Sequence, residues 1–198
     1  MRLFVAVELP QAWLDALARL VDEMQSALSK DDATRGVRVR WARSEGIHLT
    51  LKFLGETPES RLDAVLSALG QAVMAPPGIE VRLGRVGSFG DRPAPRVVWA
   101  GVEGDTRAPQ ALAARIDTWL GAAGFEKDRR GLTPHLTLAR LPDGLSQSQR
   151  EQLAALTGRF QPPPLPPFSV EYVSLIRSYL GPGGARYERV AAFPPLQP

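Results

Sequence analysis

The chain has 198 residues, of which 44% are hydrophobic, and no cysteine, a composition typical of a folded globular protein. The missing cysteines exclude disulfides, thiolate nucleophiles and cysteine-ligated zinc. No apolar run reaches the roughly 20 residues of a membrane span, so we expect a cytoplasmic protein with no membrane partner. The formal net charge is +3, and only three of the 24 cationic residues are lysines. Arginine suits phosphate partners, but a codon bias toward arginine explains this excess equally well.

The first half of the chain is predicted to mix strands and helices, because runs of apolar residues change between a period of two and a helical period. The proline-rich stretch from Gly87 to Pro95 has the composition of a functional loop that borders a substrate. The expected elements are a strand at 2–8, a helix at 10–28, a strand with a basic face at 37–41, a strand at 47–54, a helix at 57–73 capped by Thr57, and a strand at 79–86.

The second half repeats this order. Its first strand, Arg96 to Glu103, resembles Arg2 to Glu8 in beginning with arginine and ending with glutamate. We therefore expect one duplicated domain over residues 1–198, with halves of roughly 1–90 and 91–198. The fold class is α+β, with two lobes of antiparallel sheet flanked by helices, related by a pseudo-twofold axis across a central cleft. The expected elements here are strands at 96–103, 134–141 and 168–177, and helices at 106–122 and 146–157.

The chain has two histidines, His48 and His135, and each begins the same four letters, His-Leu-Thr-Leu. On a strand, alternate residues share a face, so each histidine lies roughly 7 Å from the threonine two residues later, Thr50 or Thr137. Two imidazoles in matched positions indicate an acid and a base, and two hydroxyls supply donors to phosphoryl oxygens. This set meets the needs of a phosphodiester displacement without a metal or cofactor.

The opposing interpretations are structural. A single histidine on a strand is most often structural, and threonine favours strands without any further task. The functional hypothesis depends on the pair, because a chance match of the only two histidines at corresponding places of a repeat is improbable. A zinc site is disfavoured, since two histidines are fewer than the usual ligands and no carboxylate lies beside both.

On these residues the chain resembles the two-histidine phosphoesterase superfamily and, within it, the RNA 2′,3′-cyclic phosphodiesterases, historically called 2′-5′ RNA ligases. The resemblance covers nearly the whole chain, and a looser match places Ser178, Gly184 and Tyr187 where the family has Ser, Gly and Tyr. The motifs that carry it are Arg2-Leu3-Phe4-Val5-Ala6, Trp41, His48-Leu49-Thr50-Leu51-Lys52-Phe53-Leu54-Gly55, Arg96-Val97-Val98-Trp99 and Pro134-His135-Leu136-Thr137-Leu138-Ala139-Arg140.

The resemblance implies a bilobed fold that hydrolyses a terminal 2′,3′-cyclic phosphate of RNA to a 2′-phosphomonoester. It makes His48 the proton donor to the departing 3′ oxygen and His135 the proton acceptor that activates water, while Thr50 and Thr137 hold the non-bridging oxygens. The reverse reaction would form a 2′-5′ linkage with the same groups. The implied partner is a tRNA-like or short RNA with a cyclic end, with ATP or GTP as a further possible ligand. One chain would form a complete site, so we expect a monomer.

Further substrate-binding candidates surround the motifs. Strand parity puts Lys52 on the face of His48 and Arg140 on the face opposite His135, unless a bulge returns it. Arg96, Arg130 and Arg38 or Arg40 could line the approach, although a solvated surface is the commoner role of arginine. Phe89, Trp41 and Tyr187 could stack on a base, with core packing favoured for Trp41. Two alternatives remain open: an RNA-end or nucleotide-binding module without turnover, and a phosphodiesterase for a small cyclic nucleotide.

Overall fold

The computed structural model describes residues 1–91, 94–181 and 184–195. Within these ranges helices and strands are mixed along the chain, as the predicted α+β class requires. The elements are β1 (Arg2–Glu8), α1 (Gln11–Lys30), β2 (Arg40–Trp41), η1 (Ser44–Gly46), β3 (His48–Glu56), η2 (Glu59–Arg61), α2 (Leu62–Ala72), β4 (Ile79–Asp91), β5 (Ala94–Glu103), α3 (Arg107–Ala122), β6 (His135–Arg140), α4 (Gln147–Thr157), β7 (Phe168–Val170), β8 (Val173–Gly181) and β9 (Gly184–Phe193), where η1 and η2 are short 3₁₀ turns.

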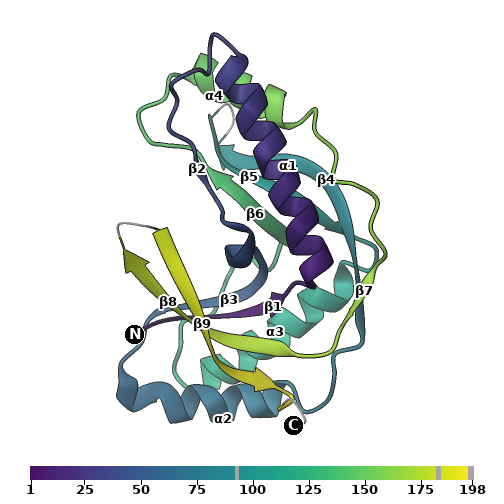
Figure 1. Cartoon of the computed structure of the whole chain (residues 1–198). Coiled ribbons are helices and arrows are strands. Elements are labelled where there is room, and N and C mark those ends of the chain that lie inside the picture. The colour runs from purple at the N-terminus through teal and green to yellow at the C-terminus, as the bar shows by residue number, and fades with distance from the viewer. Residues whose placement is uncertain (92–93, 182–183, 196–198) are drawn as a thin grey trace.

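The strands of the described ranges form one curled antiparallel sheet in the order β7-β4-β5-β6-β3-β1-β8-β9, with β2 added beside β6 (Figure 1). The two histidine strands, β3 and β6, are neighbours at its centre. Outward from β6 come β5 and then β4, and outward from β3 come β1 and then β8, so strands at corresponding places of the two sequence halves lie at corresponding places in the sheet. The sequence halves nevertheless interleave. β4 of the first half pairs with β5, and β8 of the second half pairs with β1. Each side of the sheet is therefore built from both halves of the chain.

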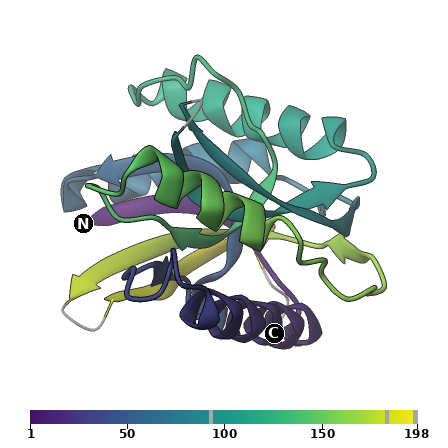
Figure 2. The same ribbon diagram turned by 90° about the horizontal axis from the view of Figure 1, so that it is seen from above.

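The helices also pair across the two halves. Helix α1 contacts α4 at one end of the sheet and α2 contacts α3 at the other, an arrangement that Figures 1 and 2 both show. The main core lies between the helices and one face of the sheet, where alternate strand residues such as Val5, Leu49 and Leu136 are buried. A smaller apolar cluster of Phe4, Ala6 and Ile176 lies apart from this core, with Tyr187 packed against it. Strand parity puts this second cluster on the face of the histidines.

Several element boundaries follow directly from local sequence. Helix α4 begins after Ser146, whose side chain accepts a hydrogen bond from the backbone N–H of Gln149, while the backbone N–H of Ser146 donates to the side-chain oxygen of Gln149. Helix α1 buries Trp13, Leu17 and Leu28 along one stripe, as the helical spacing predicts. The bounds expected for these two helices are thus confirmed to within one or two residues.

Other expectations were wrong. The helix expected from Thr57 begins at Leu62, because Pro58 is extended and a 3₁₀ turn precedes α2, while Thr57 is buried just after the end of β3. Residues 87–91 and 94–95, expected in a loop, belong to strands β4 and β5; positions 92 and 93 lie outside the described residues. The basic strand expected at 37–41 is reduced to β2.

The C-terminal strand was not predicted. The run expected as one strand at 168–177 divides into β7 and β8, and β9 returns antiparallel to β8 from Gly184 to Phe193. Glycines at 181 and 184 flank the reversal, and a glycine-rich turn between two alternating runs is a hairpin signal that could have been used. This matters for the site, because Tyr187 lies on β9.

Candidate active site

The two histidine motifs meet at the pairing of Leu49 on β3 with Leu136 on β6. In an antiparallel register this pairing sets His48 opposite Thr137 and Thr50 opposite His135, all on the face away from the leucines. The two histidines are then diagonal neighbours, about 7–8 Å apart at their α-carbons by standard geometry. They project from the adjacent strands β3 and β6 at the centre of the curled sheet.

Both imidazole rings are anchored by the backbone just before them. The Nδ1 atom of His135 lies 2.7 Å from the carbonyl oxygen of Thr133, and the His48 ring bonds to the backbone of Gly46. A carbonyl oxygen can only accept, so Nδ1 of His135 carries the hydrogen and its Nε2 keeps the free lone pair in the neutral ring. Each ring is thus held by the backbone of the residue two positions before it, and its second nitrogen is available for proton transfer.

His48 lies in a mostly apolar setting. The ring of Phe4 stacks on it at 4.6 Å between centroids, and the ring of Tyr187 meets it edge-on at 5.3 Å. Burial lowers the pKa of His48 from 6.5 to about 4, against the opposing effects of the Gly46 bond and the Glu8 carboxylate. In the free protein this imidazole is therefore neutral at pH 7.

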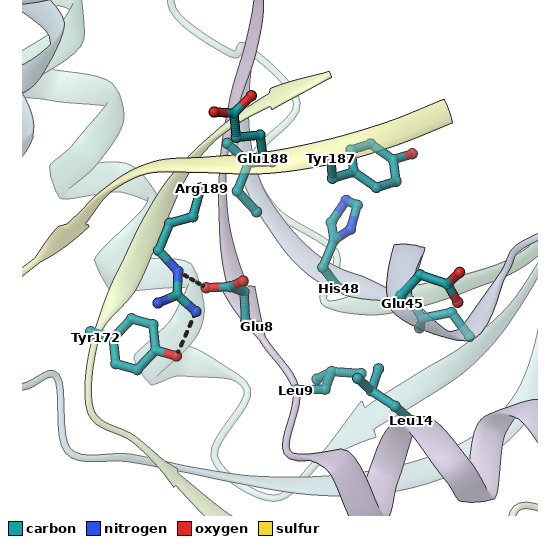
Figure 3. A pocket seen from close by; sticks show the side chains of 11 residues that line it. Glu8, Leu9, Leu14, Glu45, His48, Tyr172, Tyr187, Glu188 and Arg189 are labelled. Atoms are coloured by element: carbon teal, nitrogen blue, oxygen red, sulfur yellow. Dashed lines mark hydrogen bonds and ion pairs between the residues drawn. The ribbon is translucent and has the colours of Figure 1, made fainter. Parts of the chain in front are cut away.

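A pocket of about 200 Å³ opens beside His48 (Figure 3). Charged groups meet there: the Glu8 carboxylate oxygen Oε2 accepts hydrogen bonds from Ser174 Oγ and Arg189 Nε, both at 2.6 Å. The same guanidinium lies 3.3 Å from the hydroxyl of Tyr172. The pocket is lined by Glu8, Leu9, Leu14, Glu45, Ile47, His48, Tyr172, Ile176, Tyr187, Glu188 and Arg189. Three carboxylates and one guanidinium make this wall suited to hydroxyls and amino groups rather than to a bare phosphate.

The second histidine has different neighbours. The ring of Phe89 meets His135 edge-on at 4.9 Å and lies 4.8 Å from the ring of Trp99. Trp99 pairs with Thr137 and packs over Gly87, where a β-carbon would come within 2.4 Å of the indole. Glycine at 87 is thus required, because any side chain there would overlap the indole.

Each histidine strand carries a β-bulge at the same place. On β3 the residues Thr50 and Lys52 pair with consecutive residues of β1, and on β6 Thr137 and Ala139 pair with consecutive residues of β5, so Leu51 and Leu138 are the extra residues. A bulge reverses the alternation of faces beyond it. The positions after it therefore change sides in both motifs.

This reversal makes the placement of Lys52 on the histidine face wrong. Lys52 is 8% exposed, and its Nζ atom bonds to the Asp117 carboxylate and to the carbonyl oxygen of Glu126, near the C-terminal part of α3. It is a buried ion pair on the helix side of the sheet. Phe53, 60% exposed, takes the place on the histidine face and lies 6.0 Å from the ring of Phe4.

The same reversal places Arg140 on the histidine face, which is the outcome expected if a bulge is present. Arg140 is exposed and pairs with Arg40 of β2 on one side and with Val97 of β5 on the other. Arg40 and Arg140 therefore form a basic pair at the β6 end of the site. Phe53 and Arg140 occupy equivalent positions of the two motifs.

The remaining candidates divide into two groups. Ser178 pairs with Tyr187 across β8 and β9, so both lie on the histidine face. Arg96 falls on the opposite face by parity with Val97, and Arg130 lies in the loop before β6, where its amide bonds to Asp128. Trp41 packs against the main core, as expected.

Sequence reasoning missed Glu8, Arg189 and Phe53 as members of this face. Glu8 had a usable signal, since it is the acidic residue that directly follows the apolar run from Leu3 to Val7 on β1. The apparent match of Glu8 with Glu103 was wrong by two positions, because Glu8 pairs with His48 whereas His135 pairs with Gly101.

The described part of the chain contains no group of three or more histidine and carboxylate side chains that could hold a metal ion. None of its helices is long and apolar enough to cross a membrane.

Comparison with known proteins gives matches along most of the chain. The family model described as the 2′-5′ RNA ligase superfamily matches residues 10–182. An RNA 2′,3′-cyclic phosphodiesterase of Geobacillus stearothermophilus is 32% identical over 89% of this chain, which spans 55% of that relative's length. One of Methanothermobacter thermautotrophicus is 31% identical, with 97% of each chain covered. A crystal structure from Thermus thermophilus has a TM-score of 0.69 at 27% identity, covering 98% of this chain and 97% of the other.

Proposed function

We propose, since this chain belongs to the 2′-5′ RNA ligase superfamily, that it hydrolyses 2′,3′-cyclic phosphate ends of RNA to 2′-phosphomonoesters by acid-base catalysis with its two histidines. The observation that carries the proposal is the pairing of Leu49 with Leu136. This register sets two imidazoles and two threonine hydroxyls together on one face of a rigid sheet, within the span of one phosphate and its attacking and leaving oxygens.

The first half of the reaction uses His135. Its Nδ1–H bond to the Thr133 carbonyl leaves Nε2 unprotonated, and this atom removes a proton from a water molecule. The water oxygen forms a bond to phosphorus as the bond from phosphorus to the 3′ oxygen breaks. The hydroxyls of Thr50 and Thr137 donate to the non-bridging oxygens, where negative charge builds in the transition state.

The second half uses His48 as the proton donor to the departing 3′ oxygen, which leaves a 2′-phosphomonoester and a free 3′ hydroxyl. The donor must be an imidazolium, whereas burial lowers the pKa of His48 to about 4 in the free protein. An anionic phosphate bound beside the ring favours the charged form and raises this pKa. In this proposal the substrate itself prepares the acid.

The surroundings support contacts to the rest of an RNA end. Arg140, beside Arg40, is available to a phosphate, while Phe53 and Tyr187 offer rings for base stacking near His48. Ser178, next to Tyr187 in the sheet, adds a hydroxyl. Reverse formation of a 2′-5′ linkage would use the same groups with exchanged roles. ATP or GTP binding, a monomeric state, a cytoplasmic location and a single duplicated domain stay predictions.

The test is product analysis with a short 5′-labelled RNA that carries a 2′,3′-cyclic end, incubated with the protein and a chelator. The expected product is the 2′-phosphate alone. His48→Ala and His135→Ala should each lower kcat by about 10²-fold or more with little change in RNA affinity. Arg115→Gln, which removes a cation from the exposed side of α3, serves as the matched control. Binding of the cyclic RNA without turnover, or full activity in both histidine variants, would overturn the proposal.

A further inference from the structure

The clearest difference between the two motifs lies directly across the sheet from each histidine. Glu8 of β1 pairs with His48, whereas Gly101 of β5 pairs with His135. A β-carbon at Gly101 would lie 3.3 Å from both the carbonyl oxygen of Arg85 and the ring of Trp99, so any side chain there would crowd both neighbours. Only the first histidine therefore has an anion as its cross-strand neighbour.

We infer that Glu8 is a positioning residue that favours the protonated form of His48, and that it thereby makes His48 rather than His135 the proton donor. The inference rests on the proposed function for its role in catalysis. The coupling between the two side chains is a property of the folded protein and can be measured without substrate.

The Glu8 carboxylate is held in place by two neighbouring strands. Ser174 of β8, which is fully buried, and Arg189 of β9 both bond to its Oε2 atom. Figure 3 shows Glu8 and His48 in the same pocket, with the Arg189 side chain on the far side of Glu8 from the imidazole. Facing residues of an antiparallel pair have β-carbons about 4.5–5.5 Å apart, so a fixed charge on Glu8 acts on His48 at short range.

Other ionisable groups also face this pocket. Glu45 of η1 is exposed and bonds to Ser44, and Glu188 of β9 is exposed and accepts from the Tyr179 hydroxyl. Tyr172 bonds to Arg189, and Tyr187 offers its ring edge to His48. From β6 the cross-strand neighbour is the uncharged Thr137. Among the carboxylates, Glu8 is the one whose charge raises the pKa of His48.

The balance of charges predicts that two substitutions shift the pKa of His48 in opposite directions. Burial disfavours the imidazolium, and the Glu8 carboxylate opposes that effect. Arg189 partly neutralises Glu8, so it weakens this support. Removing the carboxylate should therefore lower the pKa of His48, and removing the guanidinium should raise it. A merely structural cluster would instead respond to both losses in the same direction.

The experiment is a pH titration followed by NMR of the two imidazoles, which are assigned with His48→Gln and His135→Gln. In Glu8→Gln the pKa of His48 should fall, in Arg189→Gln it should rise, and in Glu8→Asp it should return toward the wild-type value. An unchanged His48 titration in folded Glu8→Gln, or a fall in Arg189→Gln, would overturn the inference. If Glu8→Gln does not fold, the Arg189→Gln titration decides.

Kinetics then test the catalytic consequence. Glu8→Gln should lower kcat/KM for the cyclic RNA about three- to tenfold at pH 7, which is the effect of one charge a few ångströms away at an intermediate dielectric. It should also shift the limb of the pH profile that reports the ionisation of His48 to lower pH. A wild-type protein without cyclic phosphodiesterase activity would end the proposed function while the titration still decides the coupling. A shifted titration with an unchanged pH profile would overturn the catalytic role of Glu8.

Discussion

The surroundings of His48 and His135 differ although their backbones match. Both rings bond to a carbonyl two residues earlier, both strands share the same bulge, and both histidines face a threonine of the other motif. His48, however, is stacked on Phe4 and faces Glu8, whereas His135 meets Phe89 and faces Gly101.

This difference shows which features the two motifs share and which they do not. Backbone register and strand parity depend on the alternating apolar pattern, so both motifs have them. The side chains that face the histidines do not affect that pattern, and they can change independently. A symmetric scaffold can thus hold two chemically unequal groups, which the separate roles of acid and base require.

The largest expected effect separates the roles of the two histidines. Against a cyclic phosphate, His48→Ala and His135→Ala should both lose about 10²-fold or more in kcat. Against a nucleotide ester with a nitrophenolate leaving group, which departs without a proton, His48→Ala should recover much of the loss and His135→Ala should not. Rates measured by absorbance provide the comparison. Equal losses on both substrates would contradict the assignment of His48 as the acid.

The next effect tests a difference between the motifs at the position after each bulge, where Lys52 of one motif is equivalent to Ala139 of the other. Lys52→Ala should lower the free energy of unfolding by about 2–3 kcal/mol, because the Asp117 carboxylate, only 17% exposed, loses its partner. Lys52→Met, which keeps the volume, is measured beside it, and Lys52→Ala with Asp117→Asn should recover part of the loss. Urea denaturation gives these values; no loss in Lys52→Ala would disprove the buried pair.

A smaller effect tests whether the threonines act equally. Thr50→Ala and Thr137→Ala should each lower kcat about tenfold with a smaller change in KM, because a hydroxyl donor to the developing charge is lost. Thr50→Ser and Thr137→Ser keep the hydroxyl and should retain most of the activity. Single-turnover rates separate the chemical step from binding. Serine variants as slow as the alanine variants would show that packing, rather than the hydroxyl, is responsible.

The last effect concerns stability and pH. The folded protein binds a proton at His48 only near pH 4, whereas the unfolded chain binds one near pH 6.5, so between these values the unfolded state holds more protons. The stability that a neutral His48 supports is present above about pH 6.5 and is lost as the pH falls toward 4. His48→Gln should remove this component of the pH dependence and His135→Gln should leave it, as measured by thermal unfolding. An identical slope in wild type and His48→Gln would contradict the lowered pKa.

Sequence reasoning was successful where chemistry and periodicity agree. The α+β class, the main helices, the two histidine strands and the core position of Trp41 are all confirmed by the structure. It failed where one residue changes the parity or the pairing. The bulges at Leu51 and Leu138 reverse the sides of Lys52 and Arg140, and the hairpin that adds β9 brings Tyr187 to His48.

The sequence by itself determined that the two motifs are equivalent strands, each with one histidine and one threonine on the same face, because a period of two is a local property of the chain. Only the tertiary structure decided that these strands are neighbours, that Glu8 rather than Glu103 belongs to the site, and that the two halves exchange strands. Strand pairing and register depend on contacts between distant segments. Local sequence therefore cannot specify which charges surround His48, and those charges distinguish it from His135.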